Sequence, residues 1–481
     1  MLFNSIDFAI FLPIVFFLYW FTNKNLRLQN LLLIAAGYVF YGWWDWRFLF
    51  LLMFSTALDF SVGLALGTQQ DERKRKILLV TSIIVNLGFL GFFKYYNFFA
   101  DSFVNAFSFF GSEIRRSSLN VILPVGISFY TFQSLSYAMD TYRRKLVPTK
   151  DFIAFAAFVS FFPQLVAGPI ERATHMLPQF LSRRTFDKAK AVDGLRQILW
   201  GLFKKVVIAD NCAKYANLIF NNSDDYGGGT LVLGALFFTF QIYADFSGYS
   251  DIALGTARLF GFELMRNFNF PYFSRDVGEF WRRWHISLST WFRDYLYYPL
   301  GGSHGSTWMK VRNTFIVFIV SGFWHGANWT FIIWGALNAI YFLPLLLTNN
   351  NRNNLDVVAQ DKTFPSLKEL SLMLLTFSLT AFAWIFFRAT NIEHAIRFIS
   401  EIFSPSLFTI EEFEGWQGAV KTALLIMFFI IVEWQGRQHQ FAIAHSFQNS
   451  WRPFRWAYYI SIIFLIVFFQ GEQQGFIYFQ F

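Results

Sequence analysis

Cysteine and charged residues are both scarce in this chain of 481 residues. Its one cysteine, Cys212, excludes an intrachain disulfide framework and argues against a cysteine-based metal site. Charged residues make up 15% of the chain, against about 25% in soluble domains, and 55% of its residues are hydrophobic. A soluble protein this apolar could not cover its surface with polar groups. The composition therefore predicts an all-α, polytopic integral membrane protein.

The motifs of several common enzyme classes are also missing. The sequence has no P-loop, no glycine-rich dinucleotide turn, no His-Glu-x-x-His zinc motif and no nucleophilic serine elbow. We therefore expect no bound metal or cofactor. The net charge of +9 could indicate nucleic acid, but the basic residues form short clusters between apolar runs, which is typical of cytoplasmic loops. Membrane lipid, rather than nucleic acid, is the expected partner.

Apolar runs recur along the whole chain, and most are long enough to cross about 30 Å of hydrocarbon at 1.5 Å per residue. They lie near 6–22, 28–44, 47–67, 77–93, 119–141, 151–168, 191–209, 230–260, 311–346, 366–388, 419–434 and 456–470. One long polar stretch, 347–368, indicates a surface loop. With no internal repeat and no second domain in the sequence, we expect a single integral membrane domain over 1–481.

Lysine and arginine predict the orientation. With the N-terminus outside, the first three inside loops hold ten basic residues, and the two outside loops, which include Arg115 and Arg116, hold four. Five basic residues at 169–190 break strict alternation, which predicts that 151–168 does not simply cross. Basic residues precede the last span and only Glu472 follows it, so the C-terminus is also expected outside.

Ionisable residues inside apolar runs are costly and are therefore functional candidates. The segment 321–329 places His325 among apolar neighbours, with Trp324 and Asn328 beside it. A mostly neutral imidazole could accept a proton from a hydroxyl that attacks a carbonyl. Gly322 and Gly326 would let another backbone or a narrow substrate approach closely. From the residues alone, a structural histidine that hydrogen-bonds across two helices is an equal alternative.

A second cluster, 279–295, is rich in tryptophan and arginine. On a helix, Trp281, His285 and Ser289 would share one face. The guanidinium groups nearby could meet the phosphates of a nucleotide-bearing acyl donor. Those arginines are Arg282, Arg283 and Arg293. An interfacial amphipathic helix with an aromatic anchor explains the same pattern and is the simpler interpretation without further context.

Two more clusters complete the candidates. Asp245 and Asp251 lie within 230–260, where carboxylates need partners such as arginine or histidine on a neighbouring helix. We favour a structural pairing with those arginines. The chain ends in the aromatic segment 476–481, which includes Tyr478 and follows the last apolar run. It could simply anchor the end of the chain at the membrane interface.

At these residues the chain resembles the membrane-bound O-acyltransferase (MBOAT) family, and within it the branch of the alginate O-acetyltransferase membrane subunit. The matching segments cover roughly 120–345, and 366–481 would supply the C-terminal spans and the tail. They are 162–164 with 168–172, 245–251, 266–268 with 271–272, 280–302, and 321–326. One departure is Asn338, which stands where family members often have a third histidine.

The resemblance implies a ring of tilted helices around a tunnel through the membrane. His325 matches the catalytic histidine of the family, and His285 matches the second histidine of its bacterial branch, toward the cytoplasmic mouth. The donor is expected to be acetyl-CoA, bound near Arg282, Arg283 or Arg293. Tyr478 resembles an acyl-relay residue that passes its ester to an extracytoplasmic transferase of the SGNH type. The residues expected to support the site are Asp245, Asp251, Trp324 and Asn328.

The resemblance therefore predicts an O-acyltransferase of the bacterial cytoplasmic (inner) membrane. It would pass an acyl group, with acetyl favoured, across the membrane to an exopolysaccharide or another cell-envelope glycan. D-alanyl transfer to teichoic acid is a weaker alternative, because that subunit is shorter and its relay tail lies on a separate chain. A multi-pass transporter is the alternative from another class, although the inverted repeats that would favour it are missing.

Overall fold

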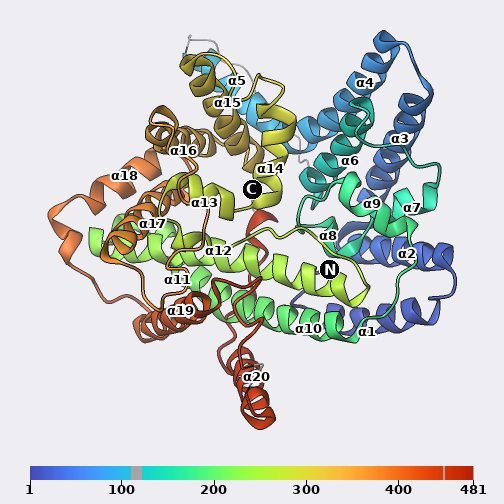
Figure 1. Cartoon of the computed structure of the whole chain (residues 1–481). Coiled ribbons are helices and arrows are strands. Elements are labelled where there is room, and N and C mark those ends of the chain that lie inside the picture. The colour runs from blue at the N-terminus through green and yellow to red at the C-terminus, as the bar shows by residue number, and fades with distance from the viewer. Residues whose placement is uncertain (110–121, 448–449, 480–481) are drawn as a thin grey trace. The chain divides into compact units, whose positions relative to one another are not determined.

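The computed structural model describes residues 1–109, 122–447 and 450–479, which form helices and loops with no β-strand among them (Figure 1). This confirms the predicted all-α fold. Some residues used in the sequence argument lie outside the described ranges. They are Arg115, Arg116, residues 119–121 of the predicted run 119–141, and Gln480 and Phe481 of the tail.

Six helical stretches among the described residues are long and apolar enough to cross a bilayer, which confirms a polytopic membrane protein. They are 26–68, 72–104, 228–259, 329–347, 367–388 and 416–436, and the shorter helix α1 is also apolar. Backbone groups have no water to bond in hydrocarbon, so a helix, which satisfies them internally, is the form these runs must take.

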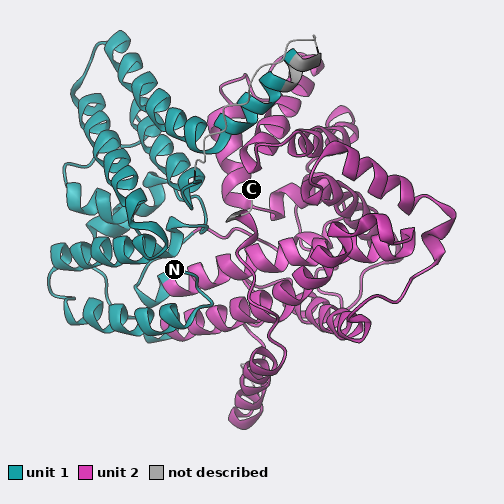
Figure 2. Ribbon diagram, turned by 180° about the vertical axis from the view of Figure 1, so that it is seen from behind, with its two compact units in different colours: residues 1–190, 257–264 teal, residues 191–256, 265–481 magenta. Residues whose placement is uncertain are grey.

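The described residues cluster into two compact units, shown in different colours in Figure 2. Unit 1 comprises 1–190 and 257–264, and unit 2 comprises 191–256 and 265–481. Compactness does not test whether they fold independently, so the single membrane domain stays a prediction.

Unit 1 contains the α-helices between residues 6 and 181. They are α1 (Ile6–Phe21), α2 (Leu26–Asp45), α3 (Leu49–Thr68), α4 (Glu72–Leu90), α5 (Tyr96–Phe109), α6 (Ile127–Tyr142), α7 (Phe152–Val159), α8 (Phe162–Leu165) and α9 (Ala173–Leu181). The run 151–168 forms only α7, of 8 residues, and α8, of 4 residues. At 1.5 Å per residue neither spans about 30 Å, so the prediction that 151–168 does not simply cross is confirmed.

Unit 2 contains most of the longest helix, Gly228–Leu259, and every candidate site residue. Its elements include α10 (Lys188–Leu202, which begins in unit 1), the π-helical turn η3 (Phe203–Ala209), α11 (Asp210–Asn221), α12 (Gly228–Leu259, which ends in unit 1), α13 (Val277–Arg283), α14 (Ile286–Phe292), α15 (Thr307–His325), α16 (Trp329–Leu347), α17 (Leu367–Arg388), α18 (Ile392–Ile402), α19 (Trp416–Gly436), α20 (Arg452–Phe468) and the last turn η8 (Ile477–Phe479). A π-helical turn inside a helical stretch often marks a functional site.

The end of α10 and the middle of α12 pack backbone against backbone. A Cβ atom on Gly201 would lie 2.6 Å from the carbonyl oxygen of Gly248, and one on Gly248 would lie 2.8 Å from that of Gly201. Only glycine permits this approach. It brings η3, which follows α10 directly, against the centre of α12.

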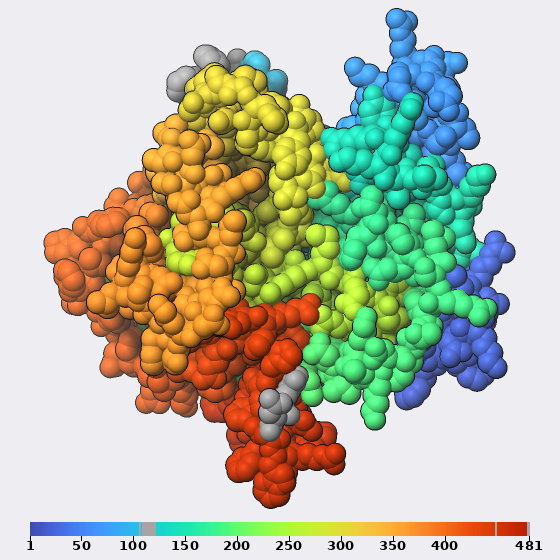
Figure 3. Space-filling view, viewed as in Figure 1, coloured from blue at the N-terminus to red at the C-terminus, as the bar shows by residue number. Residues whose placement is uncertain are grey.

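Helix α20 differs from the rest of unit 2 in how little of it is covered. Of its residues only Ile462 is buried, and apolar side chains such as Phe464 and Phe468 are exposed. Most of the helix projects from the rest of the unit (Figures 1 and 3), although Tyr459 contacts Arg196 of α10. Exposed apolar side chains are expected where a helix faces lipid. After α20 the chain turns back, and its last described residues lie inside unit 2.

Candidate active site

His325 is the last residue of α15 and is 3% exposed. The apolar run 311–346 is divided here into two helices, because the backbone turns extended at Gly326. The side chain of Asn328 then caps α16 by accepting a hydrogen bond from the Thr330 amide at 3.1 Å. Its amide group also donates to the Thr390 carbonyl at 2.9 Å. Asn328 therefore fixes the turn that presents His325.

Helices α15 and α16 pack closely at Gly322, one turn before His325. A Cβ atom there would lie 2.2 Å from the carbonyl oxygen of Phe331. The expectation that another backbone approaches Gly322 is thus confirmed. At Gly326 the close neighbour is the Phe331 ring, 2.1 Å from the added Cβ atom, so at this second glycine a side chain takes the place expected for a backbone or substrate.

His285 lies between two short helices, so the prediction of one continuous helix through 281–289 is wrong. Helix α13 ends at Arg283, α14 begins at Ile286, and His285 has left-handed backbone angles, with φ 41°. The break arises because 267–269 pairs with this stretch. The amides of Asn269 and Ile286 donate to the carbonyls of Arg283 and Asn267, both at 2.9 Å. Trp281, His285 and Ser289 therefore do not share a helical face.

The Asn267 side chain sets the proton arrangement of His285. Its Oδ1 atom accepts hydrogen bonds from the Ser287 hydroxyl at 2.9 Å and from the Ser287 amide at 3.3 Å. The Nδ1 atom of His285 lies 3.1 Å from the same oxygen, so we assign the proton to Nδ1. The Nε2 atom then carries a lone pair. It is buried and has no hydrogen-bond partner in the described part of the chain.

The ring of Tyr478, in the C-terminal tail, forms a triangle with the rings of the two histidines. Its ring centroid is 5.5 Å from that of His325 and 6.3 Å from that of His285, and the two imidazoles are 6.4 Å apart. Phe246 of α12 lies beneath the tyrosine at 4.4 Å, and Trp324 contacts both histidines. The Tyr478 hydroxyl is buried, with no hydrogen-bond partner among the described residues. Buried polar atoms left open in this way are rare outside functional sites.

Buried charge holds the tail in this position. The Ile477 amide donates to the Asp245 carboxylate at 2.7 Å. The ammonium group of Lys205 pairs with Asp245 and Asp210, both at 2.8 Å, and donates to the Gln474 carbonyl at 3.1 Å. Asp245 and Lys205 are 2% and 4% exposed. The residue next to Tyr478 is therefore hydrogen-bonded to a buried ion pair.

The two carboxylates of α12 pair with lysines, so the expectation of arginine or histidine partners is wrong. Asp251 accepts from Lys204 at 2.6 Å and from Gln197 at 2.7 Å. The reason is the close approach of η3, which carries Lys204 and Lys205 to the side of α12. Sequence reasoning missed both lysines, although they are ionisable residues inside the apolar run 191–209. The same rule would have found Glu433 in 419–434, which accepts a hydrogen bond from Tyr243.

The arginines beside His285 contact the polar loop 347–368. Arg282 donates to the carbonyls of Asn351 and Asn354 at 2.6 and 2.8 Å. Arg283 pairs with Glu279 at 2.8 Å and donates to the Asp356 carbonyl at 2.8 Å. These guanidinium groups therefore hold the loop. Their predicted role in binding the acyl donor stays a prediction.

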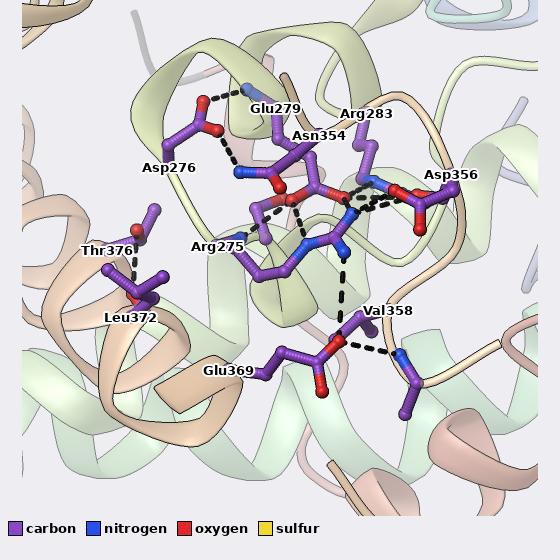
Figure 4. Close-up of polar contacts among 12 residues, drawn as sticks. Arg275, Asp276, Glu279, Arg283, Asn354, Asp356, Val358, Glu369, Leu372 and Thr376 are labelled. Atoms are coloured by element: carbon purple, nitrogen blue, oxygen red, sulfur yellow. Dashed lines mark hydrogen bonds and ion pairs between the residues drawn. The ribbon is translucent and has the colours of Figure 1, made fainter. Parts of the chain in front are cut away.

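Figure 4 shows the network that continues from Glu279 into that loop. Arg275 bonds Glu279 at 3.0 Å and the Asp356 carboxylate at 2.9 Å. Asn354 donates to Asp276 at 2.6 Å. Arg293 takes no part in it: it is half-exposed and pairs with its neighbour Asp294 at 2.9 Å. The three predicted donor-binding arginines therefore have different surroundings.

The structure thus brings together His325, His285, Tyr478 and Trp324, with Asp245 holding the tail. Asp251 pairs with Lys204 elsewhere on α12, Asn328 caps the next helix, and the arginines contact loops or solvent. The catalytic, relay and donor-binding roles of these residues stay predictions. A buried hydroxyl, two imidazoles and aromatic walls make an arrangement suited to acyl transfer from an activated carbonyl.

Comparison with known proteins agrees with this chemistry. The model of the MBOAT, membrane-bound O-acyltransferase, family matches residues 43–357. The chain is 40% identical over 449 residues to the probable alginate O-acetylase AlgI of Azotobacter vinelandii, covering 92% of this chain and 86% of that protein. It is 41% identical over 414 residues to the protein of that name from Pseudomonas aeruginosa, covering 86% and 76%.

A third relative carries a different name. The peptidoglycan O-acetyltransferase of Helicobacter pylori is 36% identical over 427 residues, covering 82% of this chain and 79% of that protein. The family model, the relatives that span most of the chain and the all-helical membrane fold lead to one assignment. The chain belongs to the membrane-bound O-acyltransferase family and is an O-acyltransferase.

Proposed function

We propose that this enzyme takes an acetyl group from a cytoplasmic donor, acetyl-CoA, and passes it across the membrane for O-acetylation of an exopolysaccharide or another cell-envelope glycan. Three relatives that cover most of the chain are named for O-acetylation of alginate or peptidoglycan, which supports the acetyl group and the glycan acceptor. The proposed location is the bacterial inner membrane, with both termini outside. That orientation rests on the distribution of lysine and arginine.

The main support for the proposal is that the Tyr478 hydroxyl is buried and that its ring lies beside the two histidines. A tail that served only as an interfacial anchor would lie at the membrane surface, with its hydroxyl in water. Here the hydroxyl is buried, the Tyr478 ring lies 5.5 Å from the His325 ring and 6.3 Å from the His285 ring (between centroids), and the preceding residue is hydrogen-bonded to Asp245. This arrangement supports the tyrosine as an acyl carrier that reacts inside the protein.

In the first step, the Tyr478 oxygen attacks the thioester carbonyl of the donor. A neutral histidine accepts the phenolic proton, a role we give to His325. The new carbon–oxygen bond forms, the carbon–sulfur bond breaks, and the histidine returns the proton to the leaving thiolate. The open lone pair of His285, whose ring centroid lies 6.3 Å from that of Tyr478, makes it the second candidate proton acceptor.

In the second step, a hydroxyl of an extracytoplasmic SGNH-type transferase attacks the tyrosyl ester. The carbon–oxygen bond to Tyr478 breaks, and the phenolate takes the proton that the attacking hydroxyl loses. Phenolate leaves more readily than an alkoxide, because the phenol is the stronger acid. The transferase then delivers the acetyl group to the glycan.

Mass spectrometry of the C-terminal peptide tests the relay directly. After the purified enzyme is incubated with acetyl-CoA and no acceptor, we expect an added acetyl group on Tyr478. Tyr478→Phe keeps the ring and removes the oxygen, so it should abolish both the modification and transfer while donor binding remains. An unmodified Tyr478 together with full activity of Tyr478→Phe would show that the tail is only an anchor.

A deletion strain tests the cellular function. We expect its envelope glycans to lose O-acetyl groups, and the wild-type gene to restore them while Tyr478→Phe does not. Loss of D-alanyl esters with unchanged O-acetyl content would favour the teichoic-acid alternative. Unchanged levels of both esters would contradict glycan acylation.

A further inference from the structure

A polar pocket lies in unit 1, where α9 ends and the chain enters α10. It has a volume of about 370 Å³ and is lined by residues of 178–190 together with Arg258 and Gly261. Four of the lining residues are cations, and only Asp187 is an anion. The cations are Arg183, Arg184, Lys190 and Arg258. The volume is within the range of pockets that hold small ligands.

Arg184 is the unusual member of this set, because it is a buried cation without a carboxylate. It is 7% exposed, and no acidic group of the described chain lies within 4 Å of its guanidinium nitrogens. Neutral acceptors satisfy part of the group: the Asn30 side chain at 2.7 Å and the Gln179 carbonyl at 3.1 Å. Its Nε–H group is buried and has no acceptor in the described ranges. An unpaired buried charge is expensive, so a counter-ion from outside the chain would stabilise it.

The neighbouring cations leave the pocket with an excess of positive charge. Arg183 is exposed, and it too has no carboxylate within ion-pair distance in the described chain. Its guanidinium group donates to the Lys24 carbonyl at 3.5 Å. Lys190 and Arg258 share one acid, Glu263, at 2.9 and 3.7 Å. Two adjacent arginines present planar groups of donors, which match the oxygens of a phosphate.

The surroundings of the pocket have the residue types that are typical of a membrane interface. Trp20 of α1 donates its ring N–H to the Leu259 carbonyl at 3.0 Å, and its ring lies against Gly261, which lines the pocket. Phe186 packs on Trp20 at 5.3 Å and is itself exposed. Tryptophan collects at the level of lipid headgroups, and exposed apolar rings beside cations suit an acyl chain next to its phosphate.

We propose that this pocket binds a phosphate-type oxyanion, carried by an anionic phospholipid, with Arg183 and Arg184 as its principal ligands. Lys190 and Arg258 add charge at the rim. The site is independent of the histidines and of the tail, and all its residues belong to unit 1. Its occupant supplies the counter-charge that Arg184 lacks.

Binding by the full-length protein in detergent tests the proposal. Native mass spectrometry would measure the affinity of short-chain phosphatidylglycerol, of phosphatidylcholine with the same chains, and of inorganic phosphate. We expect phosphatidylglycerol to bind at least about tenfold more tightly than phosphatidylcholine, since the net charge of the headgroup is recognised. If inorganic phosphate displaces phosphatidylglycerol, the pocket recognises the phosphate group alone. If it does not, the pocket recognises the intact lipid.

Matched variants locate the binding site. Arg183→Gln combined with Lys190→Gln should weaken phosphatidylglycerol binding about tenfold or more, and both side chains are exposed, so folding should be unaffected. Arg184→Lys keeps the charge but loses the planar group of donors and should also weaken binding. Lys188→Gln, an exposed lysine of the same segment outside the pocket lining, is the control and should change affinity less than about twofold. Equal affinities in all variants, an equal loss in the control, or no preference for the anionic lipid would overturn the proposal.

Discussion

Two regions of unit 2 bury polar groups in opposite ways. The histidine site, formed by His285, His325 and Tyr478, is enclosed by aromatic rings. The charged cluster lies along η3 and α12, where cations and carboxylates are paired at 2.6–2.8 Å. The cluster comprises Lys204, Lys205, Asp210, Asp245, Asp251 and Glu433. The tail contacts both regions, through Tyr478 and through Ile477.

This difference suits the two regions to different tasks: proton transfer in the histidine site, and positioning of the tail by the charged cluster. A neutral imidazole and a neutral hydroxyl can exchange a proton during acyl transfer, whereas a nearby fixed charge would hold the proton on one partner. Buried ion pairs suit a different task, because removing one partner leaves an uncompensated charge and costs about 3–5 kcal/mol. We infer that the charged cluster fixes the tail so that the histidine site can act on it.

The largest expected effect is at the histidine site. His325→Ala should lower the rate of acyl transfer by about 10²–10⁴-fold, because the proton acceptor is lost while the charged cluster stays intact. Activity with acetyl-CoA and the mass of the Tyr478 peptide would be measured on protein that elutes as wild type. His304→Ala, at an exposed histidine, serves as the control. A normally folded His325→Ala enzyme with the wild-type rate would contradict the assigned base.

The charged cluster should give a smaller and more selective effect. Asp245→Asn removes the ion pair with Lys205 and weakens the hydrogen bond from the Ile477 amide. Acetylation of Tyr478 should therefore slow by about tenfold, while the affinity for the donor stays unchanged. Asp251→Asn is the matched control, since it alters the same residue type on the same helix, also paired with a lysine, without touching the tail. Protease cleavage of the tail should increase only in Asp245→Asn. An equal effect of both variants would mean that the cluster stabilises the fold without positioning the tail.

The arginines beside His285 test where the donor meets the protein. If they bind its phosphates, Arg282→Gln, Arg283→Gln and Arg293→Gln should each raise the KM for acetyl-CoA more than they lower kcat. If Arg282 and Arg283 serve only the loop 347–368, those two variants should expose the loop to protease and leave KM unchanged. Arg293 is free of the loop network, so its variant reports donor binding alone. Unchanged donor affinity in all three variants would rule out the donor site predicted here.

The smallest expected effect concerns the same loop and its pH dependence. The hydrogen bond from Arg275 holds the pKa of the Asp356 carboxyl below its ordinary value. A lowered folded pKa contributes stability above the unfolded value of about 3.9, and that stability is lost as pH falls through the folded pKa. The protection of residues 350–360 against hydrogen exchange should therefore fall below about pH 4. The comparison is with the Asp356→Asn variant at the same pH, which lacks the carboxylate. The contribution is at most about 1 kcal/mol, because the carboxylate is largely exposed. Identical profiles would show that this contact does not hold the loop.

The length of the apolar runs and the cost of polar residues in hydrocarbon predicted the features of this protein that depend on burial in lipid. The length and apolarity of the runs gave the helices, and the short basic-flanked run 151–168 was correctly excluded as a single span. The cost of polar residues in hydrocarbon singled out His325, Asp245 and Asp251. The same cost applies to Lys204, Lys205 and Glu433, so the charged cluster was open to prediction from the sequence as well.

The sequence by itself determined a polytopic helical membrane protein and the residues able to do acyl chemistry, because composition and spacing decide what a bilayer tolerates. Tertiary structure decided the rest. Pairing with 267–269 breaks the helix at His285, and the close approach of two glycines gives the α12 carboxylates lysine partners. The return of the tail to the two histidines depends on a hydrogen bond between Ile477 and Asp245, residues 232 positions apart. No local pattern encodes contacts of that range, since they exist only once the helices have packed.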